Sequence, residues 1–127
     1  MRFFILLFAT TIAGFAQNDN LFKQCLPHLA VGGGWSTSIS IYNLTDKTAS
    51  GSLRFFDSQA RPLTLPVSHE GTLAVTDTVQ VTLAANGSTL IDLPDIGTST
   101  AQGYAVLTRA VGALSASATL RTPRMTD

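Results

Sequence analysis

Hydrophobic and polar positions alternate along much of the chain with a period of two residues. The clearest early case is the segment 34–44, whose two parities carry Trp35, Thr37, Ile39 and Ile41 on one side and Ser36, Ser38 and Ser40 on the other. Because successive side chains of a strand point to opposite faces, the segment predicts a strand with one buried and one solvated face. We expect Trp35 to anchor the buried face.

Six further segments have the same alternation or a strand-like composition between turn residues. The seven predicted strands are 35–44, 49–55, 63–67, 76–83, 89–93, 103–108 and 114–120. A preceding segment, 26–31, is expected to be extended because Pro27 disfavours helix. No sustained helical period appears beyond the N-terminal region. This pattern predicts an all-β chain with one antiparallel β-sandwich, and a small barrel is the alternative.

Turn residues predict how some of these strands pair. The strands 35–44 and 49–55 are separated by the polar segment 45–47, so we expect them to form an antiparallel hairpin. A second hairpin is predicted at Asn86 and Gly87, because both residue types tolerate positive φ.

Proline and aromatic positions add two more expectations. Pro62 and Pro66 place the short strand 63–67 at a sheet edge, since proline cannot donate a hydrogen bond to a central ladder. In the strand 103–108, Tyr104 and Val106 are expected to point into the core.

The first 16 residues have the pattern of a secretory signal peptide. Arg2 precedes a continuous apolar run, and small residues precede a cleavage site after Ala16. A membrane anchor is the alternative, but the run is shorter than the ~20 residues that span a bilayer. A lipid anchor at Cys25 is a second alternative, although residues 21–24 are not small. We expect a secreted protein, extracellular or periplasmic, without stable membrane insertion after cleavage.

The predicted organisation is one domain with short flanking segments. It comprises a signal peptide (1–16), a polar leader (17–26), the sandwich (27–122) and a C-terminal tail (123–127). Cleavage would leave 111 residues, with seven Lys and Arg against eight Asp and Glu. This near-neutral, scattered charge does not favour nucleic acid or an anionic membrane as a partner.

A single cysteine, Cys25, excludes a disulfide within the chain. We expect it to be partly covered near the start of the domain, and an intermolecular disulfide is the alternative.

Motifs for catalysis or cofactor binding are incomplete. The glycines 32–34 lack the Lys-Ser/Thr pair and the helix of a phosphate loop. No serine lies in a Gly-x-Ser-x-Gly motif. Asp92 and Asp95 lie three residues apart across a proline, which indicates turn residues more than an acid–base pair. Asn43 and Asn86 start N-glycosylation patterns, which a bacterial source would rarely use.

Histidine spacing gives no metal motif. His69 has Leu73 four residues on, where a helical zinc motif has a second histidine. A site assembled from His28, His69, Cys25 and a carboxylate remains conceivable only in three dimensions. We expect no metal, no cofactor and no catalytic residue.

Several segments together resemble immunoglobulin-like modules of secreted bacterial proteins. They are Pro27 to Thr37, Asn43 to Thr45, Leu53 to Ser58, Gly103 to Ala105 and the last strand up to Arg121. Those modules usually carry a glycine where this chain has Ala60. The resemblance implies a sandwich fold and export, with no catalytic activity and no assigned ligand. The cysteine pair of antibody domains is absent.

Tyr42 and Phe56 are the candidate partner contacts. Both fall on the predicted outer parity of their strands, and on one face they would form an aromatic patch. Coverage by the segment 22–31 is the competing interpretation. We expect a non-enzymatic structural or adhesive module that contacts an unknown protein or glycan through this patch or by strand addition. A carbohydrate-binding module is the alternative, and an exported hydrolase is third.

Overall fold

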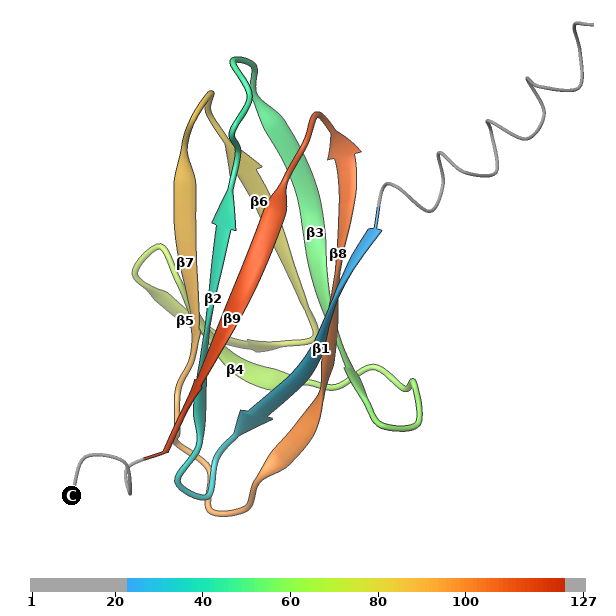
Figure 1. Cartoon of the computed structure of the whole chain (residues 1–127). Coiled ribbons are helices and arrows are strands. Elements are labelled where there is room, and N and C mark those ends of the chain that lie inside the picture. The colour runs from blue at the N-terminus through green and yellow to red at the C-terminus, as the bar shows by residue number, and fades with distance from the viewer. Residues whose placement is uncertain (1–22, 123–127) are drawn as a thin grey trace, which may run out of the picture.

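The computed structural model describes residues 23–122, which form two antiparallel sheets packed face to face (Figure 1). The strands of this region are β1 (Lys23–Val31), β2 (Ser36–Tyr42), β3 (Ala49–Asp57), β4 (Leu65–His69), β5 (Thr72–Thr76), β6 (Thr78–Leu83), β7 (Ser88–Leu93), β8 (Ala101–Val111) and β9 (Ser115–Arg121). The strand orders are β1-β8-β3-β6 and β5-β4-β7-β2-β9, and neither sheet closes on itself. The predicted all-β sandwich is confirmed, with nine strands instead of seven. The predicted signal peptide (1–16), residues 17–22 of the predicted leader and the predicted tail 123–127 lie outside the described residues.

Period-two alternation places the core between the sheets. In β2, Thr37, Ile39 and Ile41 are buried while the serines between them are half-buried on the outer face. The other fully buried large side chains include Leu29, Leu53, Phe55, Leu65, Ile91, Leu93 and Leu107. Each apolar side chain of this size contributes about 1.5–3 kcal/mol when it is fully buried.

Trp35 does not belong to this core. It is half-buried, and it is absent from the buried cluster and from the apolar side chains packed against it. The expectation of a core anchor is therefore wrong. The physical reason is its position in a tight turn, where Gly32 and Trp35 exchange backbone hydrogen bonds of 2.8 and 3.1 Å around Gly33 and Gly34. All three glycines have positive φ, which explains their choice better than loop flexibility does.

Consecutive strands almost always lie in different sheets. β2 and β3 belong to opposite sheets, and so do β6 and β7. The two predicted hairpins, 35–44 with 49–55 and the one at Asn86 and Gly87, are therefore both wrong. Within residues 23–122, only the connection from β4 to β5 joins neighbours in one sheet.

The two loops that were expected to form hairpins instead bind each other. Asn43 is 0% exposed, and its Nδ2 lies 2.7–3.2 Å from the carbonyl oxygens of Lys47, Leu83 and Ala84. Its Oδ1 accepts hydrogen bonds from the backbone and hydroxyl of Thr45. Asn86 has a φ of 60° and donates its backbone N–H to the Thr45 carbonyl. These contacts lead the chain from one sheet to the other, and they bury the Asn43 amide that a glycan would need.

The single in-sheet hairpin contains the strand that the sequence pattern missed. Glu70 and Gly71 have φ values of 54° and 80°, as a two-residue type I′ turn requires, and His69 pairs with Thr72 across it. In Figure 1 this turn projects beyond β7. β5 follows the turn and is the true edge strand, so the expected edge position of the strand 63–67 is wrong. The strand observed in that region, β4, pairs with both β5 and β7.

The turn from β3 toward β4 is organised by Asp57. Its Oδ1 accepts the backbone N–H groups of Gln59 and Arg61 at 2.9 and 3.0 Å, and its Oδ2 accepts the Arg61 Nε at 3.0 Å. The hydrogen bond from the Arg61 backbone, followed by that from Gln59, holds the pKa of Asp57 below its ordinary value of 3.8. Ala60, where the resembled modules have glycine, takes a φ of 65°.

One flank of the sandwich, formed by the edge strands β1 and β9, is joined by side chains. Gln24 in β1 donates from Nε2 to the Ala116 carbonyl at 2.8 Å and accepts the Ala116 N–H at 3.0 Å. The buried Thr37 hydroxyl binds both the N–H and the carbonyl of Ala30, at 3.2 and 2.8 Å. We call this side the closed flank. In Figure 1, β1 enters at the upper right, and β9 leaves at the lower left.

Candidate functional site

The two predicted contact residues lie in opposite sheets. Tyr42 is half-buried in β2, and its hydroxyl lies 2.9 Å from the hydroxyl of Ser117. Phe56 is half-buried in β3, which belongs to the other sheet. A shared aromatic patch of Tyr42 and Phe56 is therefore excluded by the topology. The competing interpretation, in which the segment 22–31 covers this face, fails as well, because β1 pairs with β8 as a strand of the sheet.

Phe56 instead has a different aromatic neighbour. Its ring stacks on Tyr104 of β8 with a centroid separation of 5.4 Å, and the Arg54 guanidinium carbon lies 5.5 Å from its centroid. The inward residues of β8 are Ala105 and Leu107, so the expectation that Tyr104 and Val106 point inward is wrong. The alternation in the sequence predicted that Phe56 lies on the outer face. Its neighbour Tyr104 could be found only from the pairing of β3 with β8.

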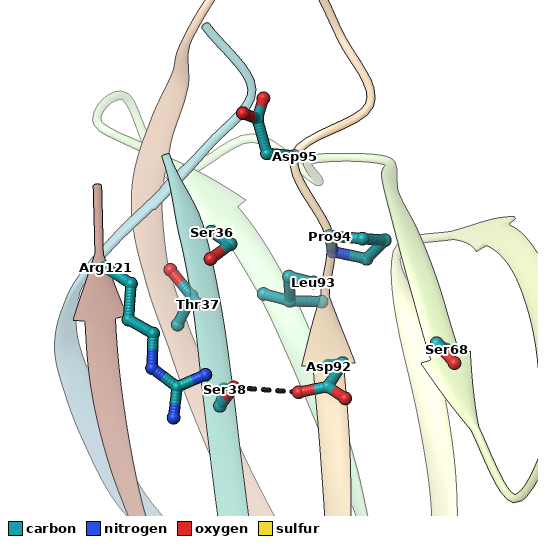
Figure 2. A pocket seen from close by; sticks show the side chains of 9 residues that line it. All are labelled: Ser36, Thr37, Ser38, Ser68, Asp92, Leu93, Pro94, Asp95 and Arg121. Carbon is teal, nitrogen blue, oxygen red and sulfur yellow. Dashed lines mark hydrogen bonds between the residues drawn. The ribbon is translucent and has the colours of Figure 1, made fainter. Parts of the chain in front are cut away.

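A polar cavity of about 380 Å³ lies near the ends of β2, β7 and β9 (Figure 2). Its lining residues are Ser36, Thr37, Ser38, Ser68, Asp92, Leu93, Pro94, Asp95 and Arg121. The Ser38 hydroxyl donates to Asp92 at 2.7 Å, and Asp95 accepts the Gly34 N–H at 3.1 Å. Figure 2 shows the Asp92 carboxylate beside Ser38 and the Asp95 carboxylate pointing away from it. Asp92 lies in β7 and Asp95 lies after it, and each carboxylate accepts a hydrogen bond from a segment more than 50 residues away in the sequence. The turn interpretation is therefore wrong for Asp92.

The histidines and the cysteine are dispersed. His28 is exposed in β1, and His69 in β4 lies 3.2 Å from the Thr89 hydroxyl. Cys25 is exposed on β1, so its expected partial covering is wrong. Among residues 23–122 no group of three or more His, Cys, Asp or Glu side chains is placed to hold a metal ion. The same residues contain no helix with the length and apolarity of a membrane span.

The flank formed by β5 and β6, here called the open flank, is built differently from the closed one. Both strands end their sheets. The first four residues of β5 are exposed, including Leu73 at 58% and Val75 at 71%. Leu73 and Val75 pair with Ser68 and Pro66 of β4, which places both on the outer face of their sheet.

The sheets also diverge at the open flank. A cavity of about 340 Å³ separates the inner face of the β4–β5 hairpin from β6, and its lining includes Thr72, Ala74, Thr76, Val79 and Gln80. The inner-face residues of β5 are therefore not packed into the core. This explains why neither face of the strand is buried.

An apolar cavity of about 280 Å³ lies next to the far end of β5. Val75 and Ile96, which are 71% and 62% exposed, both line it together with Leu65 and Pro66. No charged side chain lines this cavity. The combination of a free strand edge and an adjacent apolar cavity is the strongest candidate binding surface of the described residues. Sequence reasoning missed it because it predicted no strand over residues 72–75.

Comparison with known proteins adds no family to this description. No protein-family model matches the chain, and the search of curated proteins also gives no match. The function is therefore argued from the sequence and the geometry.

Proposed function

We propose that the chain is a secreted, non-enzymatic structural or adhesive module, immunoglobulin-like in its broad architecture, which binds a protein partner by strand addition at β5. In this mode an extended segment of the partner adds to a free sheet edge through main-chain hydrogen bonds.

The exposed apolar edge of β5 is the observation that carries the proposal. Edge strands are usually protected by charges, prolines, bulges or covering loops, because their free N–H and C=O groups pair readily with other chains. β5 has the sequence Thr-Leu-Ala-Val-Thr, with no charge and no proline, and it carries Leu73 and Val75 exposed on one face. An edge of this kind is an aggregation risk unless it has a partner.

Other parts of the proposal have separate support. The immunoglobulin-like assignment rests on the sequence resemblance together with two antiparallel sheets in about 100 residues. Export rests on the pattern of residues 1–16. The non-enzymatic character rests on the incomplete catalytic motifs of the sequence.

Site-specific photo-crosslinking tests the proposal. A benzophenone amino acid is placed at Leu73 in the exported chain, produced in its source cells, and a matched chain carries it at Leu90. Leu90 is 52% exposed on β7, in the interior of the same sheet. We expect a discrete protein adduct from position 73 only. Equal adducts at both positions, or none at position 73, would contradict strand addition at β5.

A carbohydrate-binding module is the second candidate, favoured by the Phe56–Tyr104 stack beside Arg54. Aromatic rings and a guanidinium on one outer face are suited to contacts with sugar rings and hydroxyls. A glycan array with the exported chain and its Tyr104→Ala variant tests it. The candidate requires binding that is lost in the variant while binding by a Tyr42→Ala control persists.

A further inference from the structure

The ends of β5 are acidic while its centre is apolar. Glu70 precedes the strand in the type I′ turn, and Asp77 follows it directly. Two cations lie near the ends of β5. Arg61 is engaged by the Asp57 carboxylate at 3.0 Å. Arg54 pairs in register with Thr78, next to Asp77, and its guanidinium carbon lies 5.5 Å from the centroid of the Phe56 ring. A segment that pairs along this edge therefore meets a carboxylate near each end and only Thr, Leu, Ala and Val between them.

A second copy of this chain is a poor occupant of the edge. Antiparallel pairing of two β5 strands about Ala74 would place Gly71 of one copy opposite Asp77 of the other. Glu70 and Asp77 would then be near neighbours at both ends of the ladder. Like charges in such positions destabilise strand pairing.

The cavity beside β5 adds a preference for an apolar side chain. Val75 is the one residue of β5 that lines it, and an added strand has every second side chain on the outer face to which Val75 belongs. Its volume of about 280 Å³ accommodates a branched aliphatic group, and its lining offers no charged partner. Strand addition commonly takes affinity from the main chain and specificity from such pockets.

From these observations we infer that the occupant of the β5 edge is an extended protein segment with alternating branched aliphatic residues and a Lys or Arg at each end. The aliphatic side chain next to Val75 packs on Val75 at the rim of the cavity, and the basic ends face Glu70 and Asp77. This inference rests on the proposed function, and it specifies the chemistry of the partner.

Two synthetic peptides test the inference against the full exported chain. Both have a Thr-Val-Thr-Val-Thr core, and one has two lysines at each end where the other has two glutamates. We expect isothermal titration to show binding of the lysine peptide at least about tenfold tighter at low salt. The difference should shrink at about 0.5 M NaCl, because salt screens exposed charges.

Variants of the chain locate the binding. Val75→Lys should weaken binding of the lysine peptide by about tenfold or more, and Leu90→Lys should leave this binding unchanged. Glu70→Gln combined with Asp77→Asn should remove the preference between the two peptides. Ile96→Ser should weaken binding of the peptide with the valine core. It should weaken binding of a matched peptide with an alanine core much less.

Equal binding of both peptides, binding that Val75→Lys does not affect, or no binding at millimolar concentration each overturns the inference. The proposed function has a separate readout. A position-specific adduct at Leu73 combined with any of these results leaves strand addition in place and removes only the stated partner chemistry. Peptide binding as expected without any adduct removes the proposed function in the source cells.

Discussion

The closed and open flanks of the sandwich are each formed by one edge strand from each sheet, but the side chains that contact these edges differ. At the closed flank, side chains of Gln24 and Thr37 bind backbone groups of Ala116 and Ala30 across the gap between the sheets. At the open flank, β5 carries only short or apolar side chains, and a cavity separates it from β6. The comparison teaches that one suitably placed amide or hydroxyl is enough to bind the free backbone of an edge strand, and that the edge stays exposed when none is present.

Replacement of Thr37 by valine should have the largest effect and would break the closed flank. Valine keeps the shape and branching of the side chain but leaves the Ala30 N–H and carbonyl without the hydroxyl. We expect a loss of about 2 kcal/mol in the free energy of unfolding, measured with denaturant. Thr119→Val, on the exposed face of β9, is the control and should change stability by less than about 0.5 kcal/mol. Equal losses in both variants would contradict a special role for Thr37.

Gln24→Ala weakens the same flank at a more accessible point. The Ala116 N–H and carbonyl lose their partner, but water can replace it in part. The expected loss is about 1 kcal/mol. Gln80→Ala in β6 is a matched control, since Gln80 is an exposed glutamine on an edge strand of the open flank. A cost as large for Gln80 as for Gln24 would remove the distinction between the flanks.

The turn that begins β5 can be improved. Glu70 occupies the left-handed region, which asparagine adopts more readily than glutamate. Glu70→Asn should stabilise the fold by about 0.5 kcal/mol in the same unfolding measurement. Glu70→Gln removes the same charge without the conformational gain and should leave stability near that of the wild type. A similar gain in the free energy of unfolding in both variants would show that loss of the charge, and not the backbone conformation, causes the stabilisation.

Acid should loosen the turn that leads from β3 to the open flank. The pKa of Asp57 is lower in the folded protein than its ordinary value of 3.8, so its ionised form is favoured by folding. This stabilisation is complete above the ordinary value and is lost as the pH falls through the lower folded-state pKa. The stability difference between the wild type and Asp57→Asn should therefore shrink from about pH 6 to about pH 3. A difference that stays constant over this range would contradict it.

Leu73→Lys should have the smallest effect on stability. Because Leu73 is 58% exposed and lies outside the core, we expect a change within about 0.5 kcal/mol. The variant therefore separates binding from folding at the open flank. A loss comparable to that of Thr37→Val would show that β5 is already part of the packed structure.

Local patterns predicted the strands better than they predicted the pairing. The alternation in β2 and β9 follows from which face is buried, so both segments could be found from the sequence. The residues Asn86 and Gly87 suggested a hairpin because such residues adopt positive φ. Only Asn86 does so here, and the loop crosses between the sheets because Asn43 and Thr45 bind it. That contact joins segments about 40 residues apart, which no local window contains.

The candidate site was less predictable for a related reason. The segment is short, and its apolar residues, Leu73 and Val75, are exposed instead of buried, so the strand signal in the sequence is weak. Glu70-Gly71 was the available signal of a two-residue turn, but glutamate is a poor residue for the type I′ conformation. Strand addition at an edge was anticipated in general terms. Its location depended on knowing which strands end the sheets.

The placement of the chain ends has a mechanical consequence. β1 enters on one side of the sandwich and β9 leaves at the opposite end (Figure 1). A tension between the two ends would pull along β1 and β9 and would load the β1–β8 and β2–β9 ladders in shear. Their hydrogen bonds would then have to break together, and not one after another as in peeling.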